Sequence, residues 1–139
     1  MIEDIVESLG DALSSAGYTP VYDKSFDDKG YSAKLPRSII NYLGTVEAEP
    51  NTSTSIFADE FQIFVQWESP AKPETIASFR SDCAKRRAVK QVITDWRFSA
   101  QNINGFAGFE YHLESVRAEV AQGKYVSSCI ISAKIQYME

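Results

Sequence analysis

The residue types that most often carry catalysis are scarce in this chain. His112 is the only histidine, and it lies in a stretch with the alternation of a β-strand. Histidine changes its charge near neutral pH, which makes it the first candidate for a general acid or base, yet a lone histidine on a strand is more often a surface residue. Cys129 could act beside it as a nucleophile across a hairpin. However, Cys129 shares its register with Ile131 and Ala133, which favours a place in the core.

No metal, cofactor or nucleophile motif is visible in the sequence. Cys83 and Cys129 lack the second pair of cysteines or histidines that a tetrahedral zinc site needs. The signatures of dinucleotide-binding proteins, phosphate loops, serine hydrolases and zinc proteases are absent. Asp59 and Glu60 are neighbours on a predicted strand, so their side chains point to opposite faces and make a poor acid–base pair. We therefore predict no catalytic residue, metal or cofactor, and a protein that is not an enzyme.

Charge is the more informative pattern. Residues 72–97 hold seven basic and three acidic side chains, a net charge of +4, which leaves −9 on the rest of a chain whose total is −5. Separate positive and negative surfaces can steer copies of a protein together, and a head-to-tail contact that closes gives a ring. The alternative is an ordinary solvated face. The residues that we expect at such an interface are Arg80, Lys85, Arg86, Arg87 and Lys90 on one side and Glu3, Asp4, Glu7 and Asp11 on the other.

Length and composition narrow the class of protein. The 139 residues suit one domain over 1–139, and 44% hydrophobic with 24% charged residues is typical of a folded globular chain. The net negative charge argues against nucleic-acid recognition, which depends on neutralising phosphates. No apolar run approaches the ~20 residues of a membrane span. The acidic start is unlike a secretory signal, so we expect a cytoplasmic protein with reduced cysteines.

Two regions have helical patterns. Apolar residues recur at intervals of three and four over residues 2–16, and Gly17 follows at the C-cap position. A second region begins after Pro73, with apolar residues on two nearly opposite sides of a helix. We expect a break or bend at residues 85–87 that makes two shorter helices. Residues 17–36 and 47–55 are predicted to be irregular, with a possible extended piece at 18–22, and are candidates for ordering on assembly.

The remaining apolar patterns predict strands. Residues 37–46 are apolar on both faces, which indicates burial on both sides. In residues 56–67, one face carries Phe61, Ile63, Val65 and Trp67. Residues 109–137 alternate as a long hairpin that turns at 121–124. In its first strand the apolar positions change from odd to even numbers, which would turn the apolar face to solvent unless a β-bulge lies at residues 114–115.

These elements predict an α+β fold. The expected order is a helix, two strands, a helix or helix pair, and two strands. They form a mainly antiparallel sheet of about four strands, with the helices packed on it.

At this level the chain resembles the tail terminator proteins of long-tailed phages, the lambda U type. The similarity spans nearly the whole chain and consists of element order and a few positions. An amphipathic helix is followed by an acidic segment and by Leu35-Pro36 shortly before an apolar strand with Tyr42-Leu43-Gly44. A long strand ends at Pro70 and Pro73 before the helical region, and an alternating strand closes the chain. The basic run at residues 85–87 has no counterpart in this comparison.

The resemblance implies a structural role in the virion tail, with assembly in the host cytoplasm. Such proteins cap the tail tube as a ring, usually of six copies, end its polymerisation and provide the surface that joins tail to head. The implied partners are further copies of the chain, the tail tube protein and a head-completion or connector protein.

Two other classes of protein remain as alternatives. A small immunity-type protein that caps one partner through its sheet predicts a monomer with one tight partner. A small α+β enzyme or ligand-binding domain predicts a deep pocket that holds His112 or Cys129.

Overall fold

The computed structural model describes residues 2–23, 34–47, 56–69, 75–121 and 124–138, with the side chains of 46–47, 115–121 and 124 outside the description. The elements follow as α1 (Ile2–Ser15), β1 (Thr19–Asp23), β2 (Arg37–Glu47), β3 (Ile56–Glu68), α2 (Ile76–Ala100), β4 (Phe106–Ala121) and β5 (Lys124–Met138). The predicted α+β class is confirmed. The segments expected to be irregular were 17–36 and 47–55. Most of their residues, 24–33 and 48–55, lie outside the described part of the chain.

The strands form one mixed sheet in the order β1-β2-β3-β5-β4. Strand β1 runs parallel to β2, and all other neighbours are antiparallel. The expectation of about four strands is therefore wrong, because the extended piece after Gly17 is a fifth strand. Pro20 interrupts its pattern, but an edge strand tolerates a proline because one row of its backbone amides needs no partner in the sheet.

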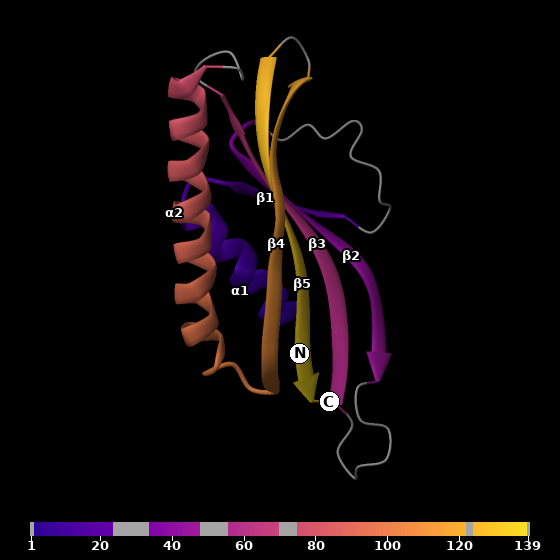
Figure 1. Ribbon diagram of the computed structural model, residues 1–139. Helices are drawn as coiled ribbons and strands as arrows, with labels where there is room; N and C mark the ends of the chain where they lie inside the picture. The colour runs from indigo at the N-terminus through magenta and orange to yellow at the C-terminus, as the bar shows by residue number, and fades with distance from the viewer. Residues whose placement is uncertain (1, 24–33, 48–55, 70–74, 122–123, 139) are drawn as a thin grey trace.

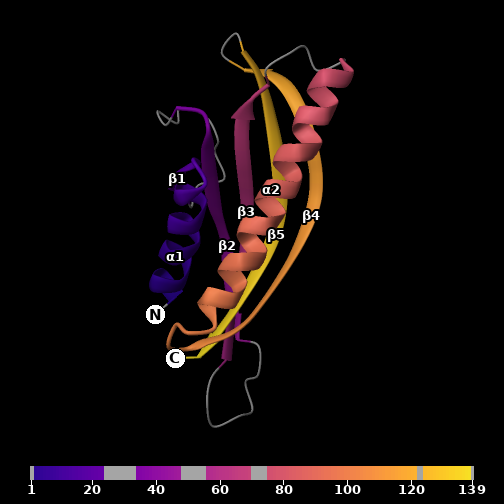
Figure 2. The ribbon, with the colours of Figure 1, turned by 90° about the vertical axis from the view of Figure 1, so that its left-hand side faces the viewer.

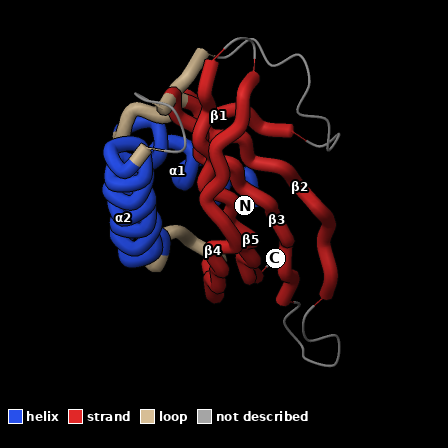
Figure 3. The backbone as a smooth tube through the Cα atoms, turned by 45° about the horizontal axis from the view of Figure 1, so that its top comes forward, coloured by secondary structure: helices blue, strands red, loops and turns tan. Residues whose placement is uncertain are grey.

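Both helices cover the same face of the sheet, α1 on the side of β1 and β2 and α2 on the side of β4 and β5 (Figures 1 and 2). Figure 3 shows the helices grouped on one side of the strands. The buried core between these layers takes Ile5, Leu9 and Leu13 from α1, Val89, Ile93, Trp96 and Ala100 from α2, and the inward row of each central strand. The predicted inward row of β3 is confirmed, since Phe61, Ile63, Val65 and Trp67 are all buried in this core.

Helix α1 is amphipathic, as predicted. Its buried residues follow the spacing of one face, and Gly17 just after it has φ of 101°, a left-handed conformation that glycine adopts without strain. Trp96 joins the two helices: its Nε1 donates to the Ser8 Oγ at 2.7 Å, and its ring meets Phe109 edge-on with centroids 4.9 Å apart. The helix pair is thus fixed to the sheet by a polar and an aromatic contact.

Helix α2 is continuous through residues 85–87, so the predicted break or bend into two helices is wrong. The prediction assumed that both apolar sides had to be buried. Only the side with Val89 and Ile93 is buried, whereas Ile76 and Phe79 on the other side are each 63% exposed. One straight helix therefore satisfies the pattern because it leaves part of its apolar surface uncovered by the described chain.

The hairpin of β4 and β5 is present with the predicted bulge. Leu113 pairs with Ile131 and Ser115 pairs with Ile130, so Glu114 is the extra residue. The predicted inward residues beyond it on β4 (Val116, Ala118 and Val120) have side chains outside the described part. In β2, Ile39 and Ile40 are buried on opposite faces as expected, whereas Leu43 is exposed.

Candidate functional site

The predicted acidic residues share one exposed face of α1. Glu3, Asp4, Glu7 and Asp11 are all exposed, and at 3.6 residues per turn they lie opposite the buried residues of the helix. A hydrogen bond from its own backbone amide lowers the pKa of Glu3. The acidic face is therefore presented to solvent and is not used to pack the fold.

Tyr22 of β1 lies beside this acidic face and is 52% exposed. Partial burial raises the pKa of its hydroxyl, and the negative charges of Asp11 and Glu7 act in the same direction. An aromatic surface thus borders the acidic face. We refer to Glu3, Asp4, Glu7, Asp11 and Tyr22 together as the acidic surface.

The predicted basic residues of α2 lie on more than one side of the helix. Arg86 and Arg87 lie four and three residues before Lys90 and follow one flank with it, and Arg80 lies two turns before Arg87. Lys85 projects from the opposite flank. Among the described residues, none of these five side chains has an ion-pair partner. The structure therefore brings four of the five together on one flank, where none of them forms an ion pair with another described residue.

Two of the three large exposed apolar side chains described on α2, Ile76 and Phe79, follow the same flank with the half-buried Cys83, and the third, Phe98, lies near the other end of the helix. Ile76, Phe79 and Cys83 recur at intervals of three and four and lead to Arg86 and Lys90. A small pocket of about 220 Å³ lies here, lined by Phe79, Asp82, Cys83 and Arg86. We refer to Ile76, Phe79, Arg86, Arg87 and Lys90 as the basic–apolar flank.

The acidic surface and the basic–apolar flank lie at opposite sides of the molecule. Figure 2 shows α1 beside β1 and β2, and the N-terminal half of α2 beside β4 at the far side of the sheet. Helix α1 faces only the C-terminal half of α2, where Trp96 and Val92 meet it. The basic residues before Lys90 are therefore out of its reach.

The structure separates the two residues considered for nucleophilic catalysis. His112 is exposed and pairs with Ser132, whereas Cys129 is fully buried and pairs with Val116, so they lie on opposite faces of the hairpin. The core position predicted for Cys129 is confirmed. Burial raises the pKa of its thiol to about 11, although the positive charge of Arg86 acts in the opposite direction. A thiol with this pKa is protonated at neutral pH and is a poor nucleophile.

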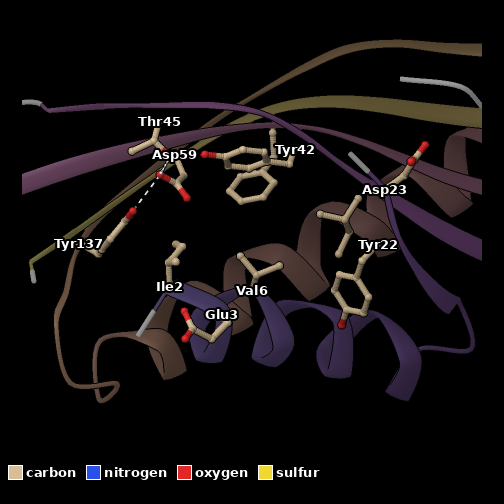
Figure 4. Close-up of a pocket in the computed structure, with 11 residues that line it drawn as sticks. Ile2, Glu3, Val6, Tyr22, Asp23, Tyr42, Thr45, Asp59 and Tyr137 are labelled. Carbon is tan, nitrogen blue, oxygen red and sulfur yellow. Dashed lines mark hydrogen bonds between the residues drawn. The ribbon is translucent and has the colours of Figure 1, made fainter. Parts of the chain in front are cut away.

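A cavity of about 560 Å³ opens between the start of α1 and the sheet (Figure 4). Its floor contains Asp59, Phe61 and Tyr137, which are almost completely buried, and its rim contains the exposed Glu3 and Tyr22. The sequence analysis did not find this cavity. The available signal was the register of Asp59, which shares the inward row of Phe61 and Ile63 on β3.

The Asp59 carboxylate is held by hydroxyl groups. Its Oδ1 accepts hydrogen bonds from the Tyr137 hydroxyl at 3.0 Å and from the Thr45 hydroxyl at 2.6 Å, and the Tyr42 hydroxyl contacts Thr45 in turn. Glu60, its neighbour in sequence, is exposed on the other face, with an oxygen 3.9 Å from the Lys134 Nζ. The prediction that Asp59 and Glu60 point to opposite faces is confirmed.

Within the described ranges, no group of three or more histidine, cysteine or acidic side chains is placed to hold a metal ion. None of the helices described is both long and apolar enough to span a membrane. The chain matches no protein-family model and no curated protein.

Proposed function

We propose that this protein is a ring-forming structural component of a phage tail, of the tail terminator type. In this role it caps the tail tube, ends its polymerisation and provides the surface that joins tail to head. The observation that supports the proposal best is the presence of complementary surfaces at opposite sides of one molecule. The element order of the sequence, which resembles that of tail terminators, supports the same class.

The contact that we propose is heterologous. The basic–apolar flank of one copy meets the acidic surface of the next, so every copy uses both surfaces, and a ring of six copies closes if the rotation at each contact allows it. The partners are therefore further copies of the chain, with the tail tube protein on one side of the ring and a head-completion or connector protein on the other.

Charge and apolar area contribute differently to this contact. An exposed ion pair stabilises by only ~0.2–1 kcal/mol, so Arg87 and Lys90 mainly steer and orient the approach. Covering an exposed phenylalanine removes on the order of 100 Å² of apolar surface from water, which is worth about 2–3 kcal/mol. Phe79, packed against an aromatic such as Tyr22 of the next copy, would therefore hold the complex together.

The test is the mass in solution by light scattering, over a range of protein and salt concentrations. We expect a step from monomer to a closed oligomer that weakens as salt rises, because the screening length falls from ~10 Å at 0.1 M to ~3 Å at 1 M. Reversal of charge in Arg86→Glu/Arg87→Glu should abolish the oligomer. Lys34→Glu, a reversal at an exposed lysine that belongs to neither surface, is the control and should leave the oligomer intact.

Two results would contradict the proposal. One is an assembled mass that is unchanged by the reversal at Arg86 and Arg87. The other is a strict monomer at every concentration, together with failure to bind the end of a preformed tail tube. That second result would favour the alternative of a small protein that caps a single partner.

A further inference from the structure

The cavity under α1 contains a negative charge in surroundings that are mostly apolar and aromatic. Asp59 is 3% exposed and stands among Phe61, Tyr42 and Tyr137. Figure 4 shows its carboxylate between Tyr137 and Tyr42, directed toward the space above Ile2. A buried carboxylate is costly unless hydrogen bonds or a cation compensate it.

The described residues compensate the charge of Asp59 only in part. Two hydroxyl donors converge on one oxygen of Asp59, and no lysine or arginine of the described residues forms an ion pair with it. The carboxylate therefore keeps the ability to accept a charged donor from outside.

We propose that this cavity binds an organic cation, an ammonium or guanidinium group carried on a short apolar stem. The charged group would donate to Asp59 and face the aromatic rings, which attract cations through their π faces. The stem would pack against Ile2 and Val6 at the mouth. A volume of about 560 Å³ lies within the range of pockets that hold small molecules or a long side chain.

Such a cation can come from a free amine or from a basic side chain of a second copy. Both sources present the same chemistry to Asp59, and the binding site does not depend on the proposed role in a phage tail. Light scattering separates the sources. If a side chain of a neighbouring copy normally occupies the cavity, butylammonium lowers the assembled mass and 1-butanol does not. If the ligand is a free amine, the assembled mass is unaffected.

The direct test is calorimetric titration of the monomer with butylammonium and with butylguanidinium. The control ligand is 1-butanol, which has a similar apolar stem but no charge. We expect both cations to bind at least about tenfold more tightly than the alcohol, as for a charged hydrogen bond. Asp59→Asn should weaken the binding of both cations by at least about tenfold and leave the binding of the alcohol unaffected. Glu60→Gln, the adjacent exposed carboxylate, is the matched control and should change nothing.

Val6→Phe provides a second variant that keeps the carboxylate and fills the mouth of the cavity. It should block the cations and the alcohol alike, so the proposal stays testable if Asp59→Asn does not fold. Equal affinity for cation and alcohol would overturn the proposal. So would the absence of any binding, or cation binding that both Asp59→Asn and Val6→Phe leave unchanged.

Discussion

Truncation of two isoleucines on α2 should have very different effects on stability. Ile93 is 1% exposed in the core between the helix and the sheet, whereas Ile76 is 63% exposed on the basic–apolar flank. Ile93→Ala and Ile76→Ala remove the same atoms from the same helix. Ile76 is the first residue of the helix and Ile93 lies in its interior, so their helix-propensity terms differ, but by less than ~0.7 kcal/mol, and burial dominates the comparison.

The expected magnitudes follow from that burial. Ile93→Ala loses transfer free energy and leaves a cavity, so the free energy of unfolding should fall by about 2–5 kcal/mol. Ile76→Ala should change it by less than ~0.5 kcal/mol, because an exposed side chain gains little from folding and alanine is the better helix former. The two variants should thus differ by roughly 2 kcal/mol or more.

Urea unfolding, followed by circular dichroism at a concentration where the protein is monomeric, measures both variants. An unchanged dependence on urea in each case would show that the extent of unfolding is the same. Similar losses for Ile76→Ala and Ile93→Ala would refute the reasoning, since they would mean that both sides of α2 are buried in the monomer. Ile76→Ala should instead weaken self-association, which light scattering on the same samples detects.

Two further predictions concern buried polar groups. Well below pH 9 the thiol of Cys129 is protonated in both the folded and the unfolded state. As pH rises through 9 toward about 11, the unfolded chain releases this proton while the folded protein retains it, so the free energy of unfolding should fall. Urea midpoints should show this fall in the wild type and less of it in Cys129→Ala, and equal slopes would contradict the prediction. Tyr137→Phe removes a hydrogen-bond donor to the buried Asp59 and should lower the free energy of unfolding by about 1–3 kcal/mol in the same assay. Tyr111→Phe should lower it only a little, and equal losses in the two variants would contradict the prediction.

The sequence was sufficient where a local pattern and burial agree. The helix over residues 2–16, the inward row of β3 and the bulge in β4 could all be read from the period of apolar residues, because one face of each element is buried. The bulge was predictable for a specific reason: without it, half of the apolar positions of β4 would face solvent.

The failures have physical reasons as well. Strand β1 is short, contains Pro20 and pairs only along one edge, so its strand character depends on β2 and not on its own pattern. The continuity of α2 could not be deduced, because the pattern does not tell whether Ile76 and Phe79 pack inside the chain or remain exposed.

The candidate sites were predictable only in part. The charges of α1 and α2 are visible in sequence, but their placement at opposite sides of one sheet follows from the topology. The cavity at Asp59 combines residues from α1, β1, β2, β3 and β5, and no local pattern brings these together.

The central claim, a head-to-tail contact between the two surfaces, is tested most directly by mixing two charge-reversed proteins. Arg86→Glu/Arg87→Glu/Lys90→Glu reverses the basic side of the contact from +3 to −3, and Asp4→Lys/Glu7→Lys/Asp11→Lys reverses the acidic side from −4 to +2. Each alone should be monomeric at low salt because like charges then face each other at every contact. An equimolar mixture restores opposite charges at every contact. Light scattering should therefore show the wild-type oligomer mass in the mixture, and a mixture that stays monomeric while the wild type assembles would contradict the account.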